Sequence, residues 1–107
     1  MKHRTLGKSQ LQVSELCLGT MMFGDQTGID DARRIAAHAR EHGVNFIDTA
    51  DVYTLGASEA MVGELIREAR HDWVLATKCG NKMGDAPNRS RYSRAWVLRA
   101  CDESLQR

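Results

Sequence analysis

Three short apolar runs recur along the chain at nearly equal intervals. They cover residues 16–20, 45–50 and 73–78. Each run is short and largely apolar, as a strand that is covered on both faces should be. The runs therefore predict three buried β-strands.

A helical pattern follows each run, with apolar residues three or four positions apart. The predicted stripes are Ala32, Ile35, Ala36 and Ala39, then Met61, Val62, Leu65, Ile66 and Ala69, and last Val97, Leu98, Cys101 and Leu105. The predicted N-caps are Asp30, Ser58 and Ser93, and Gly43 is the predicted stop of the first helix. A helix after each of three strands makes a string of βα units, whose strands pair in parallel.

Residues 1–14 show a different pattern, that of a β-hairpin, with a turn over residues 7–10. Parallel βα units occur in open doubly wound sheets and in closed (β/α)8 barrels. Residues 19–24 lack the GxGxxG pattern that marks the first turn of many open sheets. We therefore expect an α/β fold in which one domain over residues 1–107 is the N-terminal part of a (β/α)8 TIM barrel. The hairpin covers 1–14 and three βα units follow from about residue 15.

The chain is short for this architecture. A complete barrel takes about 250 residues, and the chain has 107. We expect a truncated barrel that is inactive alone and is either poorly stable or associates with itself through its open sheet edges.

Composition removes several classes of function. Lys and Arg number 15 and Asp and Glu 14, so a net charge of +1 gives no electrostatic case for nucleic acid or an anionic membrane. Cys17, Cys79 and Cys101 are odd in number and lack a CxxC pair, which argues against a disulfide scaffold and a cysteine zinc site. The sequence shows neither a signal peptide nor a membrane span. We expect a cytoplasmic protein.

Charged residues stand near the C-terminal ends of the second and third predicted strands. Side-chain alternation places Asp48 on the side of Phe46, and Lys78 on the side of Ala76. An unpaired charge beside a core is costly, so we expect Asp48 and Lys78 to pair across neighbouring strands. Tyr53 follows the second strand and can enter the same site. A structural ion pair with an unrelated tyrosine is the alternative, but a phenol beside a cation is a better proton donor.

Four segments match one known family in order and spacing. They are residues 18–24 (LGTMMFG), 48–53 (DTADVY), 58–63 (SEAMVG, through its Ser-Glu and Val-Gly pairs) and 76–78 (ATK). With them the chain resembles the N-terminal part of the aldo-keto reductases, NADPH-dependent enzymes with a (β/α)8 barrel. The resemblance runs from about residue 4 to residue 107. It is closer to the bacterial and channel-subunit-like branches than to the vertebrate aldose reductases.

The resemblance implies a role for each matching residue. The protein would reduce a small aldehyde or ketone to an alcohol with NADPH. Tyr53 would be the general acid, Lys78 would make its phenol a stronger acid, and Asp48 would pair with Lys78. The cofactor-binding residues would be Gly19, Thr20, Met21 and Asp48. The runner-up is a non-catalytic nicotinamide-binding module, such as a channel-subunit-like protein, or a degenerate fragment.

Two departures accompany the resemblance. The family usually has glycine after the tyrosine, where this chain has Thr54. The family's catalytic histidine lies at the end of the fourth strand, and none of the four histidines here lies at a predicted strand end. His38 and His42 fit an H-x-x-E-H zinc pattern. We expect no metal site there, because Glu41 lies opposite the apolar stripe and faces solvent.

Overall fold

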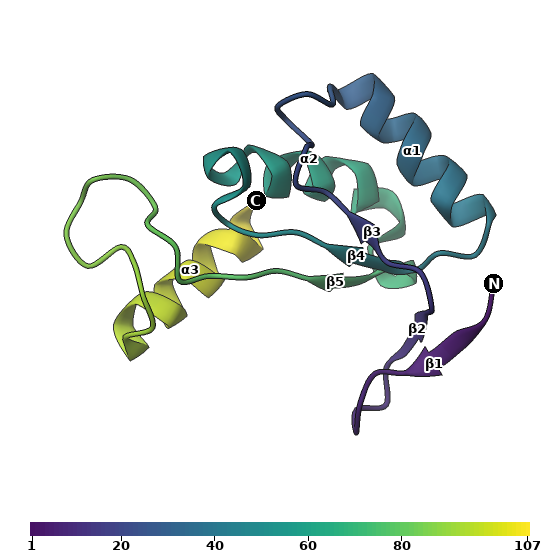
Figure 1. Cartoon of the computed structure of the whole chain (residues 1–107), viewed down its shortest axis with the longest axis horizontal. Helices are drawn as coiled ribbons and strands as arrows, with labels where there is room; N and C mark the ends of the chain where they lie inside the picture. The colour runs from purple at the N-terminus through teal and green to yellow at the C-terminus, as the bar shows by residue number, and fades with distance from the viewer.

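The strands form two separate sheets in the computed structural model, which describes residues 1–107 (Figure 1). β1 (His3–Thr5) and β2 (Gln12–Ser14) pair antiparallel. β3 (Leu18–Gly19), β4 (Phe46–Asp48) and β5 (Val74–Ala76) pair in parallel, in the order β3-β4-β5. Figure 1 shows the antiparallel pair at one end of the molecule and the long loop after β5 at the other.

A helix follows each parallel strand. These are α1 (Ile29–Glu41), α2 (Ala57–Ile66) and α3 (Arg94–Gln106). Short 3-10 segments, Tyr53–Gly56 and Arg67–Asp72, flank α2. The predicted α/β class is confirmed. None of the helices combines the length and the apolar character that a membrane span requires.

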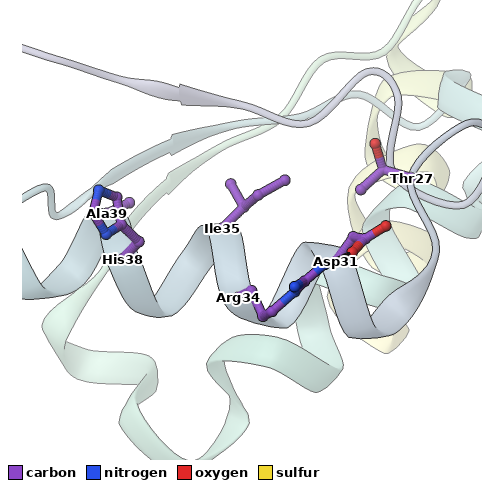
Figure 2. Close-up of a pocket in the computed structure, with 6 residues that line it drawn as sticks. All are labelled: Thr27, Asp31, Arg34, Ile35, His38 and Ala39. Atoms are coloured by element: carbon purple, nitrogen blue, oxygen red, sulfur yellow. Dashed lines mark hydrogen bonds and ion pairs between the residues drawn. The ribbon is translucent and has the colours of Figure 1, made fainter.

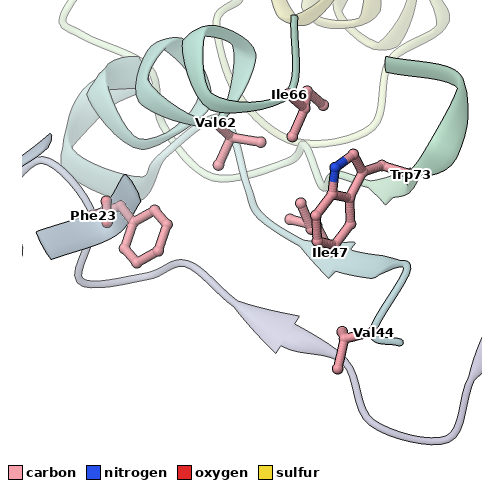
Figure 3. Close-up of a cluster of buried hydrophobic side chains, with 7 residues drawn as sticks. Phe23, Val44, Ile47, Val62, Ile66 and Trp73 are labelled. Atoms are coloured by element: carbon pink, nitrogen blue, oxygen red, sulfur yellow. The ribbon is translucent and has the colours of Figure 1, made fainter. Parts of the chain in front are cut away.

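The main core lies between the parallel sheet and the helices α1 and α2. Its buried members are Phe23, Ala32, Val44, Ile47, Val62, Ile66 and Trp73 (Figure 3). Leu18 on β3 and Leu75 on β5 pack against this cluster. One residue from each strand thus faces the helices, and its sequence neighbours face the opposite side of the sheet.

Two predicted helix signals are correct. Gly43 follows α1 with φ of +81°, a left-handed conformation that glycine adopts without steric cost, and its N–H donates to the carbonyl of Arg40 at 2.9 Å. Ser93 is the N-cap of α3, and its Oγ accepts the backbone N–H of Trp96 at 3.2 Å.

Two predicted N-caps are wrong. α1 begins after Gly28 and α2 after Gly56, and neither N-cap has a capping side chain. Asp30 lies inside the first turn of α1, where a carboxylate still interacts well with the helix dipole. Ser58 lies inside α2 because its hydroxyl is used in a buried contact with the sheet.

The predicted apolar stripe of α3 is also wrong. Leu98 is 49% exposed, Leu105 is 79% exposed and Cys101 is exposed. The buried face carries Trp96 and Ala100, which form a second small core cluster with Met83. α3 therefore packs on the segment that follows β5 and leaves its most apolar stripe uncovered.

Candidate active site

The parallel register brings Asp48 and Lys78 together. Asp48 ends β4 and is paired with Ala76 of β5, so Lys78 lies just beyond it on the same side. Lys78 Nζ donates to Asp48 Oδ2 at 2.7 Å and to the carbonyl oxygen of Thr49 at 2.6 Å. Each side chain is a little under half exposed. The predicted ion pair is therefore present at the C-terminal edge of the sheet and open to solvent.

The surroundings of Lys78 favour its charged form. Burial by itself would lower the pKa of Lys78. The hydrogen bond with Asp48 and the proximity of Tyr53 outweigh this effect, so the pKa of Lys78 is raised. The site therefore holds a fixed positive charge over the physiological pH range.

Tyr53 comes to the same place from the turn between β4 and α2. Lys78 Nζ lies 4.9 Å from the centroid of the Tyr53 ring, a cation–π distance. The structure thus assembles all three predicted catalytic side chains, Asp48, Tyr53 and Lys78. A carboxylate fixes the ammonium, and the ammonium lies against the phenol ring.

A layer of buried hydroxyls supports this edge of the sheet from behind. Ser58 Oγ donates to the carbonyl oxygen of Thr20 at 2.8 Å and lies 3.2 Å from the hydroxyl of Thr49. Thr20 Oγ1 donates to the carbonyl of Asp48 at 3.1 Å. All three hydroxyl residues are buried. This network joins the ends of β3 and β4 to α2, and it explains why Ser58 does not cap that helix.

Among the predicted cofactor residues, Gly19 and Met21 are exposed and Thr20 is buried. Gly19 lies opposite Asp48 in the register, and a Cβ at Gly19 would meet no atom within 4 Å. Met21 is 60% exposed, whereas the side chain of Thr20 is committed to the hydroxyl network. Open space beside a carboxylate that can accept ribose hydroxyls fits the nicotinamide-ribose end of a dinucleotide.

Cys17 is a site neighbour that the sequence reasoning missed. It lies two residues before Gly19, just ahead of β3, and the charges of Asp48 and Lys78 both act on it. Partial burial, followed by the charge of Asp48, raises the pKa of the Cys17 thiol, and Lys78 only partly opposes this. Cys17 therefore stays a neutral thiol beside the ion pair, and its spacing from Gly19 is the signal that could have found it.

A second buried polar cluster lies between α2 and the end of the chain. Glu59 is 5% exposed and accepts hydrogen bonds from Thr77 Oγ1 at 2.5 Å and from Arg107 Nε at 2.7 Å. Thr77 immediately precedes Lys78. The cluster therefore attaches the strand end that carries Lys78 to α2.

A wide surface hollow lies elsewhere, along α1. It has a volume of about 680 Å³ and is lined by Thr27, Asp31, Arg34, Ile35, His38 and Ala39 (Figure 2). It contains none of the three candidate catalytic residues. His38 and His42 are exposed, with ring centroids 4.2 Å apart, and the chain holds no cluster of three candidate metal ligands. The hollow is therefore separate from the candidate active site.

The parallel βα units thus present a carboxylate, a lysine and a tyrosine together at the C-terminal edge of their sheet, in a protein of the α/β class. The chain belongs to the aldo/keto reductase family, whose model matches residues 15–107. The resemblance read from the sequence is thereby confirmed.

Curated relatives and solved structures agree with this assignment. The chain is 40% identical to an uncharacterised oxidoreductase of Bacillus subtilis, over 100% of its own length and 35% of the relative. It is also 40% identical to a probable voltage-gated potassium channel subunit beta of Arabidopsis thaliana, over 100% of the chain and 34% of that protein.

Among solved structures, an aldo-keto reductase of Bacillus halodurans in its holo form matches with a TM-score of 0.85 and 40% identity, over 99% of this chain and 36% of that one. A putative aldo-keto reductase of Pseudomonas aeruginosa matches with a TM-score of 0.84 and 38% identity, over 97% of this chain and 41% of that one. The chain therefore spans about a third of the length of its curated relatives.

Proposed function

We propose that the chain supplies the proton-donating part of an NADPH-dependent enzyme that reduces small aldehydes or ketones to alcohols. The observation that carries this proposal is the position of Lys78 Nζ, 2.7 Å from Asp48 Oδ2 and 4.9 Å from the centroid of the Tyr53 ring. The fold of that enzyme would be a (β/α)8 barrel, to which these residues contribute the hairpin and the first three βα units.

In this mechanism Tyr53 is the general acid. As a carbonyl carbon is reduced, negative charge develops on its oxygen, and the Tyr53 hydroxyl donates a proton to that oxygen. Lys78 stabilises the resulting phenolate by its charge, and Asp48 keeps the ammonium in place. When bound, NADPH supplies the hydride.

The nicotinamide-ribose end of the cofactor would lie along Gly19 and Met21. Gly19 leaves its side of β3 clear, and the Asp48 carboxylate can accept hydroxyl hydrogen bonds. Thr20 would contribute through its position in the backbone, because its side chain is buried. In this proposal the binding partner besides the cofactor is a small carbonyl compound, and neither nucleic acid nor a membrane takes part.

A second candidate function is nicotinamide binding without turnover. The 40% identity to a probable potassium channel subunit beta favours keeping this candidate. Both candidates need Gly19 and Asp48 for binding, but only the enzyme needs the hydroxyl of Tyr53. Loss of the Tyr53 hydroxyl therefore distinguishes the two candidate functions.

The test compares Tyr53→Phe with the parent in the complete protein that contains these residues. We expect carbonyl reduction to fall by about 10²-fold or more, as for loss of a general acid, while the Kd for NADPH stays unchanged. Tyr92→Phe is the matched control, because Tyr92 is 79% exposed and takes no part in the ion pair. Equal turnover in Tyr53→Phe and parent would exclude Tyr53 as the acid. Cofactor binding without turnover in the parent would support the second candidate.

A further inference from the structure

Asp51 is a buried acid that the proposed chemistry does not use. It is 1% exposed, and neither of its carboxylate oxygens has a hydrogen-bond donor. Buried polar atoms are almost always paired, and burying a carboxylate without a partner is costly. The cost of burying Asp51 suggests that its side chain has a role at this position in the fold.

The backbone of Asp51 links the segments that carry Lys78 and Tyr53. The backbone N–H of Asp51 donates to the carbonyl oxygen of Lys78 at 3.1 Å. Two residues later, the N–H of Tyr53 donates to the carbonyl of Ala50 at 3.2 Å. The turn that carries Tyr53 is therefore attached to the backbone of Lys78 through Asp51. Val52, which lies between Asp51 and Tyr53 in the sequence, packs against the small core cluster of α3.

Charged groups from α2 and α3 surround the Asp51 carboxyl, and most of them are already paired. Glu59 on α2 binds Thr77 and Arg107, and Glu103 on α3 binds two arginines. Arg107 keeps one buried donor, Nη2, without an acceptor. No cation is thus committed to Asp51.

Electrostatics at this position favour the neutral acid. Burial raises the pKa of the Asp51 carboxyl, and the charges of Glu59 and Glu103 raise it further. The dipole of the nearby Val52 N–H and the charge of Arg107 lower this pKa without cancelling the rise.

On its other side, Tyr53 is followed by strained backbone. Thr54 has φ of +48° and Leu55 has φ of +49°, a left-handed conformation that is unfavourable for side chains other than glycine. Strain of this kind persists only where the surrounding structure holds it in place. Because Thr54 and Leu55 are both exposed, their own side chains do not provide that hold. The hold must come from the residues that flank them.

We propose that Asp51 is a positioning residue, whose buried side chain anchors the turn between β4 and α2 and thereby keeps the Tyr53 ring against Lys78. The proposal rests on the proposed function only for the role given to Tyr53. The neutral carboxyl costs less to bury than the ionised form, which draws toward water and loosens the turn. Contact between Tyr53 and Lys78 therefore depends on the protonation of Asp51.

The experiment measures that contact by NMR in the complete protein that contains these residues, where the Tyr53 ring signals are assigned by their loss in Tyr53→Phe. With tyrosine ring labelling, we expect a nuclear Overhauser cross-peak between the Tyr53 ring and the Lys78 side chain. The cross-peak weakens as the pH rises through the raised pKa of Asp51. Lys78 stays charged over this range, because its own pKa is raised as well. In Asp51→Asn, a neutral isostere, the cross-peak persists and no longer depends on pH.

Asp51→Ala is expected to lose the cross-peak while keeping the dispersed amide spectrum of a folded chain. Asp102→Asn, which removes an exposed and unpaired carboxylate from α3, is the matched control and should behave like the parent. If Asp51→Ala unfolds, the comparison of pH profiles between the parent and Asp51→Asn decides. An unchanged profile in Asp51→Asn, or no cross-peak in the parent at any pH, would overturn the proposal. Neither readout uses cofactor or turnover, so this result is independent of the test of the proposed function.

Discussion

The two faces of the parallel sheet differ in almost every physical property. On the face toward α1 and α2, Ile47 is 2% exposed and lies in the main core cluster (Figure 3). On the opposite face, the next residue, Asp48, has a side chain that is 43% exposed, and its partner Lys78 is 47% exposed. One peptide bond separates a core residue from a candidate catalytic one.

This difference shows how a short strand can serve stability and chemistry together. Burial of apolar area on the helix face supplies the free energy of folding. The open face contributes little to stability, because exposed ion pairs are weak. Its residues are therefore free to meet a cofactor and a substrate, and changes on the two faces should have separable effects.

The largest expected effect is on the helix face. Ile47→Ala should destabilise the fold by about 2–5 kcal/mol, because it removes buried methyl groups and leaves a cavity in the core. Urea unfolding followed by circular dichroism measures the loss. Ile35→Ala is the matched control: Ile35 is 41% exposed on α1 and should cost far less. Equal losses in the two variants would contradict the assignment of the core to this face.

The second-largest expected loss of stability comes from the buried hydroxyl network of Thr20, Thr49 and Ser58. Ser58→Ala should cost about 1–3 kcal/mol, because it leaves the buried Thr49 hydroxyl without a partner and removes a hydrogen bond to the Thr20 carbonyl. The same unfolding measurement applies. Ser90→Ala, which removes a hydroxyl with no hydrogen bond in the structure, should be close to neutral. A neutral Ser58→Ala would mean that the network does not bear on stability.

Local alternation along the strands was enough to predict the pair of faces. Short apolar runs predict β4 and β5, side-chain alternation places Asp48 and Lys78, and parallel pairing then brings the two together. The Tyr53 assignment needed the family resemblance in addition, because its turn has no period. What these predictions share is that they depend on neighbours within one or two strands.

The features that the sequence did not predict depend on contacts between distant elements. Helical periodicity identified α3 but not its buried face, since Trp96 and Ala100 are selected by the loop around Met83. The sequence pattern predicts Ser58 as an N-cap, but its hydroxyl binds Thr20, which is distant in the sequence. Asp51 gave no signal at all, because burial of an acid in a turn is a property of the assembled fold.

A smaller change, an increase in the free energy of unfolding, is expected at the residue that follows Tyr53. Thr54→Gly should stabilise the chain by up to about 1 kcal/mol, because relief of left-handed strain exceeds the entropic cost of glycine. The family's usual glycine would thus be restored after the tyrosine. A higher urea midpoint is the readout. Thr5→Gly in β1, where no such strain exists, should destabilise instead. A loss of stability in Thr54→Gly would mean that Thr54 makes compensating contacts.

The smallest expected effect on stability is the most informative about the open face. Asp48→Asn should change the free energy of unfolding by at most about 1 kcal/mol near neutral pH, as for an exposed ion pair. It should nevertheless lower the pKa of Lys78, because burial then acts with less opposition. Side-chain NMR of the Lys78 ammonium measures this pKa directly.

The pH dependence of stability gives the sign of that contribution. The pKa of Lys78 is raised in the folded chain, so its stabilising effect is fully present below the ordinary lysine pKa and is lost as pH rises through the raised value. Parent and Asp48→Asn should therefore differ at neutral pH and converge under alkaline conditions. Asp25→Asn, which removes an exposed carboxylate without an ion pair, should show neither change. If Asp48→Asn cost as much as Ile47→Ala, the separation between a stabilising face and a chemical face would not hold.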